Sequence, residues 1–241
     1  MIERSLVSWG TTEIPYEIRR SARRATVSLA IEPEGGLFVT APAATPITKL
    51  DHVVRSKARW ITQHLAQRVR APEPAAREFV SGETCLYLGR QYRLAVVQSE
   101  QVGPIQLRAG RLHLAIPSAL PKGREPAYTR AALVDWYRRR AREHLPPWLR
   151  SFAARLGVHH VAVLVADQAK RWGSCSGRTV RLNWRVMQAP KRVIEYVLAH
   201  EAVHLVHEHH GPAFWAMLGR LMPDYEVRKA RLREMGAGLV W

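Results

Sequence analysis

The sequence predicts an α+β fold, in which a β-rich N-terminal section precedes a domain that packs a small antiparallel sheet on helices. Apolar and polar residues alternate in short runs within 13–42 and again within 79–116, and this period of two is typical of strands. After residue 126 the apolar residues recur mainly at three- and four-residue spacing, which is typical of helices. We therefore expect a β-rich region over residues 1–125 and a second domain over residues 126–241.

The β-rich region also contains one predicted helix. Gly35-Gly36 separates two of the alternating runs and indicates a hairpin. Between Thr48 and about Val69 the apolar spacing becomes helical. Residues 71–78, with two prolines and mixed charge, indicate a linker. Four short strands, separated by glycines, are then expected before residue 117.

The second domain mixes helices with two strands. Its first helix is expected from about Tyr128 to Leu145, where Pro146-Pro147 either kinks or ends it, and helical spacing resumes from Trp148 to Leu156. The remaining expected elements are strands over 161–166 and 179–187 around a turn-rich segment at 173–177, a long helix over 191–208, and a helical stretch over 213–235 that is interrupted at Pro223.

Size, composition and cysteine use indicate an ordinary globular protein. The chain has 241 residues, of which 47% are apolar, and this argues against disorder. Its longest purely aliphatic run, 161–166, is far shorter than the ~20 residues needed to cross a bilayer. The first ten residues lack the apolar core of a secretion signal, and Cys85 and Cys175 form no CxxC pair. We expect a soluble, cytoplasmic protein without a membrane segment.

The charge balance is strongly basic, with 37 Lys and Arg against 20 Asp and Glu and a net charge of +17. Such a charge attracts polyanions, and nucleic acid is therefore a possible partner. Two clusters are dense: Arg19-Arg20 with Arg23-Arg24, and Arg138-Arg139-Arg140 with Arg142. Arginines spread over solvated surfaces would give the same composition, so the charge alone leaves both interpretations open.

The segment His200-Glu201-Ala202-Val203-His204 has the HExxH pattern of a metal site on a helix. At about 100° per residue, His200 and His204 lie about 40° apart, while Glu201 lies about 60° from His204. Two imidazoles and one further ligand leave zinc a fourth position for water, whose pKa the metal lowers toward ~7. The pattern therefore predicts a zinc-dependent metallopeptidase with Zn²⁺ on His200 and His204 and with Glu201 as general base.

Three histidines compete for the role of third ligand. Five of the eleven histidines of the chain lie between residues 200 and 210. His207 reaches the metal only if the helix stays regular beyond His204. His209 and His210 precede Gly211-Pro212, where the chain turns, so either of them can swing back. Spacing alone leaves His207, His209 and His210 open.

Four stretches carry a resemblance to a known family. They are Arg171-Trp172-Gly173-Ser174-Cys175-Ser176, Leu182-Asn183-Trp184, Tyr196 to His204, and His210-Gly211-Pro212-Ala213-Phe214-Trp215. Together they resemble the YgjP-like family of SprT-related zinc metallopeptidases, the minigluzincins. The resemblance implies a zincin-like catalytic domain in which His200, His204 and His210 bind zinc. His209 and Gly211 stand where the family has Asn and Ser.

The region beside the predicted helix 191–208 has two further expected roles. A strand that begins at Thr179 can offer its edge to an extended peptide through main-chain hydrogen bonds. Cys175 has no cysteine partner nearby, and we interpret it as a packed thiol because free cysteines usually behave as small buried hydrophobes. Trp172 and Trp215 are expected in the core or in the wall of a cleft.

Three functions compete on these observations. The leading hypothesis is hydrolysis of peptide bonds in a protein or peptide substrate. The first alternative is a DNA-associated basic protein, in which the zinc domain serves binding or the proteolysis of DNA-bound proteins. The second is a binding module stabilised by zinc, which Glu201 argues against because structural zinc needs ligands but no base.

Overall fold

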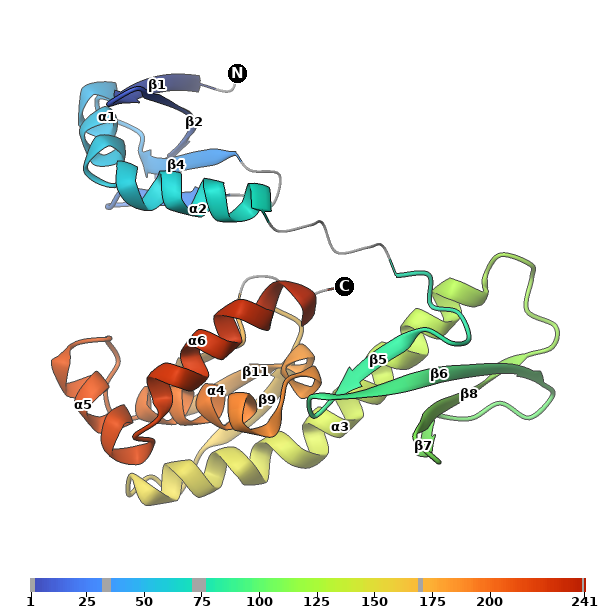
Figure 1. Cartoon of the computed structure of the whole chain (residues 1–241). Coiled ribbons are helices and arrows are strands. Elements are labelled where there is room, and N and C mark those ends of the chain that lie inside the picture. The colour runs from blue at the N-terminus through green and yellow to red at the C-terminus, as the bar shows by residue number, and fades with distance from the viewer. Residues whose placement is uncertain (1–2, 32–35, 71–76, 169–170, 240) are drawn as a thin grey trace. The chain divides into compact units, whose positions relative to one another are not determined.

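The computed structural model describes residues 3–31, 36–70, 77–168, 171–239 and 241. Helices and three small mixed sheets make up the described chain (Figure 1), which confirms the predicted α+β class and its β-rich N-terminal section. The chain divides into two compact units, residues 1–73 and 74–241. The boundary expected after residue 125 lies inside the second unit and stays a prediction. Gly35 and most of the expected linker, 71–76, lie outside the described residues.

The first unit is a four-stranded sheet with two helices. Its strands follow the order β1-β2-β4-β3, and the β2–β4 pair is parallel. The helical stretch expected over 48–69 is divided at Lys57, whose N–H donates to the Val54 carbonyl. The two helices contribute Leu50, Val54 and Ile61 to the core, where all three are fully buried. The elements are β1 (Glu3–Trp9), β2 (Thr12–Ser21), β3 (Ser28–Ile31), β4 (Leu37–Pro42), α1 (Ile47–Ser56) and α2 (Ala58–Arg70).

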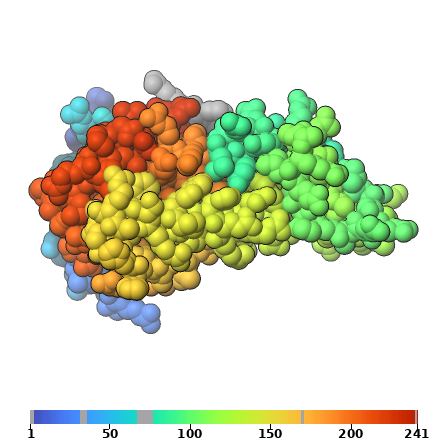
Figure 2. Space-filling view, turned by 90° about the horizontal axis from the view of Figure 1, so that it is seen from below, coloured from blue at the N-terminus to red at the C-terminus, as the bar shows by residue number. Residues whose placement is uncertain are grey.

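The second unit begins with another four-stranded sheet, in the order β5-β6-β8-β7. One face of this sheet buries Leu94, Leu112 and Leu114 in the same core as Leu133 and Trp136 of α3. Figure 2 shows α3, in yellow, extending from the green strands of this sheet toward the red C-terminal helices of the same unit. These elements are β5 (Thr84–Tyr87), β6 (Arg90–Ser99), β7 (Gln106–Arg108), β8 (Arg111–Pro117) and α3 (Glu125–Arg155).

Helix α3 continues through Pro146-Pro147, so the prolines do not end it, and it includes the stretch from Trp148 in which helical spacing resumes. Leu145, Leu149 and Ala153, on both sides of the prolines, are fully buried. Proline removes backbone hydrogen bonds from a helix interior, and burial of this apolar face offsets that loss. The result is a single helix of 31 residues.

The third sheet differs from the prediction at both of its ends. Residues 173–177 were expected to form a turn, but Gly173–Ser176 form strand β10, which pairs with β11 (Thr179–Asn183) across a turn at Gly177, where φ is +56°. The strand expected over 179–187 stops at Asn183, because the Asn183 side chain accepts from the Arg185 N–H and caps a 3₁₀ turn. Strand β9 (Ala162–Ala166) completes the order β10-β11-β9.

Helix α4 (Lys191–Val203) lies at the centre of the second unit and contacts α3, α5, α6 and β10. Nine of its residues are buried, so it is held on most of its circumference. None of the helices in the described ranges has the length and apolarity needed to span a bilayer. The remaining elements are η1 (Trp184–Gln188), α5 (Pro212–Leu221), α6 (Tyr225–Met235) and η2 (Gly236–Leu239).

Candidate metal centre

The C-terminal end of α4 carries His200 and Glu201, and the helix ends earlier than predicted. It stops at Val203 instead of continuing to residue 208, so His204 is the first residue after it. Beyond this point the chain tightens, and His204 Nδ1 lies 3.1 Å from the His207 carbonyl oxygen. His207 therefore does not continue the helical face of His200 and His204.

Three imidazoles converge beside this helix end. The Nε2 atom of His210 lies 3.0 Å from Nε2 of His200 and 3.2 Å from Nε2 of His204. One ligand nitrogen from each of the three rings lies within 4.8 Å of the others, a spacing at which the three could hold a metal ion. The structure thus brings together the three predicted ligands, whereas His207 and His209 are not members of this group.

The protonation of these rings suits a cation. A carbonyl only accepts, so Nδ1 of His204 is the donor in its contact with His207, and Nε2 is the nitrogen that faces the other two rings. Burial, together with the neighbouring His204 and His210, lowers the pKa of His200 to about 3. Burial also lowers the pKa of His210. Neutral imidazole is the form that binds metals.

Helix α5 fixes the position of His210. Trp215 Nε1 donates to the His210 carbonyl at 3.0 Å, and the two rings stack with centroids 5.6 Å apart. Phe214 is fully buried, with its ring 4.6–5.0 Å from all three imidazoles. Trp215, which the sequence assigned to the core or a cleft wall, therefore packs directly against the cluster. Pro212 begins α5 at the first helical turn, where proline is favoured.

Glu201 is a buried carboxyl group beside the three histidines. Only 6% of the residue is exposed, and its Oε2 has no hydrogen-bond partner among the described residues. Burial raises the pKa of Glu201 to about 7, against a smaller lowering effect of Arg171. The group therefore exchanges its proton near neutral pH, as a general acid or base requires.

Strand β10 passes directly against Glu201. A Cβ atom at Gly173 would lie 2.6 Å from Glu201 Cγ and 2.7 Å from Oε1, closer than side chains pack. Glycine is needed here to let the strand approach the carboxyl group. The sequence did not single out Gly173 as a site residue, because residues 173–177 were expected to form a turn and a glycine signals such an approach only within a predicted strand.

The comparison with protein families decides the identity of this arrangement. A family model described as "YgjP-like, metallopeptidase domain" matches residues 25–235, which is most of the chain. The chain belongs to the YgjP-like metallopeptidase family. This confirms the family expected from the four sequence stretches. No curated protein matched the sequence.

Membership of the YgjP-like metallopeptidases establishes the general activity. The protein is a peptidase that acts on proteins or peptides, and its domain implies a bound metal. The His200, His204 and His210 cluster is a group that could bind it.

Cys175 lies on β10 near this centre, in surroundings that favour the protonated thiol. Its side chain is half-buried, and Sγ lies 3.6 Å from the Gly177 carbonyl oxygen. Burial, together with the charge of Glu201, raises the pKa of the Cys175 thiol to about 11. Because the thiolate is the nucleophilic and metal-binding form, this protonated thiol fits the predicted packing role.

Proposed function

We propose that this YgjP-like metallopeptidase is a zinc enzyme, in which His200, His204 and His210 hold the metal and Glu201 is the general base. The convergence of three Nε2 atoms beside a buried carboxyl group carries the proposal. Three neutral imidazoles suit zinc, which in catalytic sites takes three protein ligands and keeps one position open.

Each part of the site has a role in hydrolysis. A zinc ion supplies a Lewis acid that polarises the scissile carbonyl and lowers the pKa of water toward ~7. Glu201 accepts the proton of the attacking water at its carboxylate and returns it to the leaving amine. A pKa of about 7 favours both transfers near neutral pH.

The strand that begins at Thr179 was expected to offer its edge to a peptide, but β11 is the central strand of its sheet and both of its edges are paired. We propose instead that β10 supports the substrate backbone. Within the described strands it pairs with β11 alone, so its other edge has free N–H and C=O groups. An extended peptide that adds to this edge is held by main-chain hydrogen bonds, with little dependence on its sequence. The contact between Gly173 and Glu201 brings this edge next to the catalytic carboxyl group.

The experiment that tests this function is the Glu201→Gln variant. It keeps the shape of the side chain and removes the base, so we expect full zinc content and a 10²–10⁴-fold loss of cleavage of a denatured protein substrate, the usual contribution of a general base. Glu208→Gln, an exposed neighbour, is the matched control and should retain activity. Unchanged cleavage by Glu201→Gln, or a wild-type protein that is active without metal, contradicts the proposal.

A second candidate function is proteolysis of proteins bound to DNA. The unit that contains the histidines, residues 74–241, has 26 Lys and Arg against 13 Asp and Glu. This excess favours a polyanionic partner near the peptidase. Cleavage of a DNA-binding protein that is stimulated by DNA, and inhibited by high salt, would support this function over a general peptidase.

A further inference from the structure

The outer face of the β5-β6-β8-β7 sheet carries three arginines in one row. The register places Arg93 of β6 opposite Arg111 of β8, and Arg111 opposite Arg108 of β7. Paired residues share a face, and the next residues on β6 and β8, Leu94 and Leu112, are buried on the other one. All three arginines are exposed. We call them the arginine row.

The arginine row is not neutralised by the protein. Among the described residues, none of the three makes an ion pair or a hydrogen bond through its side chain, and strands β5 to β8 contain no acidic residue. Adjacent strands lie about 4.8 Å apart, and like charges directly opposite each other destabilise a sheet. Repulsion between the three guanidinium groups therefore destabilises the free protein, and an anion that bridges the groups would remove this repulsion.

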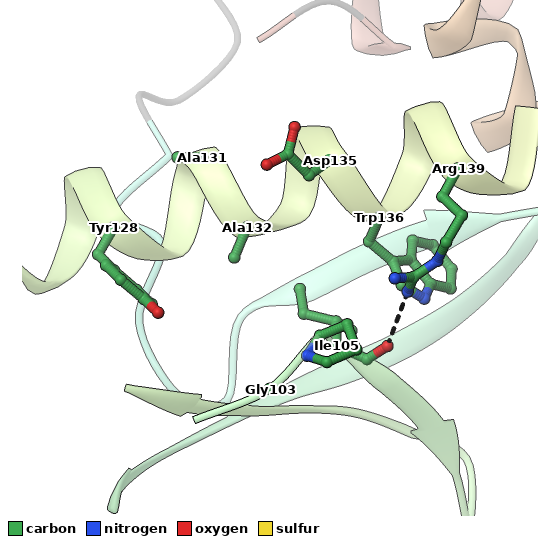
Figure 3. A pocket seen from close by; sticks show the side chains of 9 residues that line it. Gly103, Ile105, Tyr128, Ala131, Ala132, Asp135, Trp136 and Arg139 are labelled. Atoms are coloured by element: carbon green, nitrogen blue, oxygen red, sulfur yellow. Dashed lines mark hydrogen bonds between the residues drawn. The ribbon is translucent and has the colours of Figure 1, made fainter. Parts of the chain in front are cut away.

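Some of the other arginines are engaged within their own units. Arg138 pairs with Asp167, and Arg140 pairs with Glu143. Arg139 lines a cavity of about 390 Å³ between α3 and the loop before β7, and its guanidinium donates to the Ile105 carbonyl (Figure 3). The guanidinium groups of the basic run 138–140 therefore already have partners within the protein.

The arginine row also engages no acidic neighbour, in contrast to Arg20 of the N-terminal cluster, which pairs with Glu3. The hairpin Arg108-Ala109-Gly110-Arg111 aligns two members of the row, because its two turn residues have positive φ and place the flanking arginines opposite each other. The third, Arg93, is brought in by the parallel pairing of β6 with β8.

The chemistry of the face indicates which polyanion it fits. Guanidinium groups bind phosphate through two parallel hydrogen bonds. The tyrosines of these strands, Tyr87 and Tyr92, are buried or partly buried and contact each other, so they offer no platform for stacked bases. Small residues, Ala95 and Ala115, lie near the row on the same face. His113 of β8 is the one aromatic ring of these strands on the face of the row, and it is only half-exposed. The exposed guanidiniums therefore dominate this face and favour contact with phosphates over contact with bases.

We propose that the arginine row binds the phosphate backbone of a nucleic-acid duplex. The binding needs neither the metal nor Glu201, because the row lies on a different sheet from β10. It therefore does not rest on the proposed peptidase mechanism. Since both belong to the unit 74–241, a protein attached to the bound duplex would be held near the peptidase site.

Fluorescence anisotropy with a short labelled DNA duplex of mixed sequence tests the proposal. The protein is the full chain carrying Glu201→Gln, so that cleavage does not interfere. We expect the logarithm of the association constant to fall linearly with the logarithm of the salt concentration. The steepness of this line should decrease by about 3, at ~0.9 per phosphate contact, in the triple variant Arg93→Gln, Arg108→Gln, Arg111→Gln. The affinity of the triple variant at low salt should fall at least about tenfold.

A second triple variant provides the matched control. Arg130→Gln, Arg142→Gln and Arg150→Gln remove the same charge from exposed positions of α3 and should keep most of the affinity and the slope. Equal losses in both triple variants would mean that only net charge matters, and would overturn the proposal. So would absence of duplex binding by the parent protein, or tighter binding of single-stranded DNA or polyglutamate than of the duplex.

Folding of the variants is checked independently. Removing the row takes away like-charge repulsion, so the triple variant should unfold at an unchanged or higher temperature than its parent. Loss of binding together with a lower unfolding temperature would attribute the effect to the fold and overturn the assignment to the row. Chelation of the metal should leave duplex binding unchanged, and a loss of binding on chelation would contradict independence from the metal centre.

Discussion

The metal centre and the arginine row both gather three like side chains, but they do so in opposite ways. Three imidazole nitrogens lie 3.0–3.2 Å apart around His210, held by Trp215 and by the buried ring of Phe214. The three guanidiniums of the row are exposed and share only a strand register. A close, fixed set selects one small cation with a defined geometry. A loose, flexible row suits an extended polyanion whose charges need no exact position.

The largest effect is expected at the fixed set, where a single ligand decides metal binding. His210→Ala should weaken zinc binding by more than the roughly 100-fold that follows loss of an outer hydrogen-bond partner, because one of the three converging nitrogens disappears. His209→Ala, which alters the adjacent exposed histidine, should leave binding unchanged. Competition with a chelator of known affinity measures both. Equal loss of zinc affinity in the two variants would mean that His210 is not distinguished from His209 as the third ligand.

The next largest effect is expected where β10 contacts Glu201, and it tests how precisely the carboxyl group must be placed. Gly173→Ala introduces a Cβ 2.6 Å from Glu201 Cγ, so either the carboxyl group or β10 must move. We expect a roughly 100-fold loss of kcat, the usual result of a displacement near 1 Å, and a stability loss of about 1–3 kcal/mol from overpacking. Gly103→Ala, whose added Cβ meets nothing within 4 Å, is the control. Full activity of Gly173→Ala would separate β10 from the catalytic group.

Charge should lower the stability of the free protein both at the buried Glu201 of the metal centre and at the exposed arginine row. The effect should be larger at Glu201 because it is buried. Burial raises the pKa of Glu201 from 4.5 to about 7. Because the folded-state pKa lies above the unfolded one, ionisation of Glu201 costs stability increasingly as pH rises from 4.5 to 7, and the cost is constant above 7. In metal-free protein at pH 8, Glu201→Gln should therefore be more stable than wild type by up to about 3 kcal/mol, at ~1.4 kcal/mol per pH unit.

Urea unfolding of chelator-treated protein measures this difference. It should vanish below pH 4.5, where Glu201 is protonated in both states. Glu208→Gln, at an exposed position, should show no such pH dependence. A stability gain that is the same at pH 4 and pH 8 would assign the effect to packing instead of charge.

The smallest effect is expected at the exposed row. Arg111 lies between Arg93 and Arg108 in the register, so Arg111→Gln removes two unfavourable neighbours at once. We expect a gain of about 0.2–1 kcal/mol in unfolding free energy at low salt, shrinking as added salt screens the charges. Arg130→Gln, on the exposed surface of α3, is the comparison. A destabilised Arg111→Gln would show that the arginines are not strained in the free protein.

The two regions also differ in how far the sequence predicts them. Within the site, His200 and His204 are four residues apart on one helix, so local periodicity alone predicts that they meet. The family resemblance added His210, because its position depends on the turn at Gly211 and on Trp215. The end of α4 at Val203 was predicted five residues late, since histidine and valine spacing continued the helical pattern beyond it.

Features set by strand pairing could not be predicted in this way. Arg93 and Arg111 are distant in the sequence and become neighbours only through a parallel register. The approach of Gly173 to Glu201 likewise depends on how β10 packs against α4. The class of the fold and most of its elements followed from apolar periodicity, but β1 and β10 were not expected. Of the two outcomes expected at Pro146-Pro147, an end of the helix is wrong, because burial of Leu145 and Leu149 holds the helix on both sides of the prolines.

Because α3 continues through its two prolines, it connects the sheet that carries the arginine row to the helix that carries His200. Its first half packs against β8, whose strand carries Arg111, and α3 also packs against α4, whose end carries His200. At 1.5 Å per residue, Leu133 and Leu149 are separated by about 24 Å along the helix axis. A polyanion bound to the sheet would therefore be held at a fixed separation from the metal centre, which favours cleavage of peptide segments that span this separation.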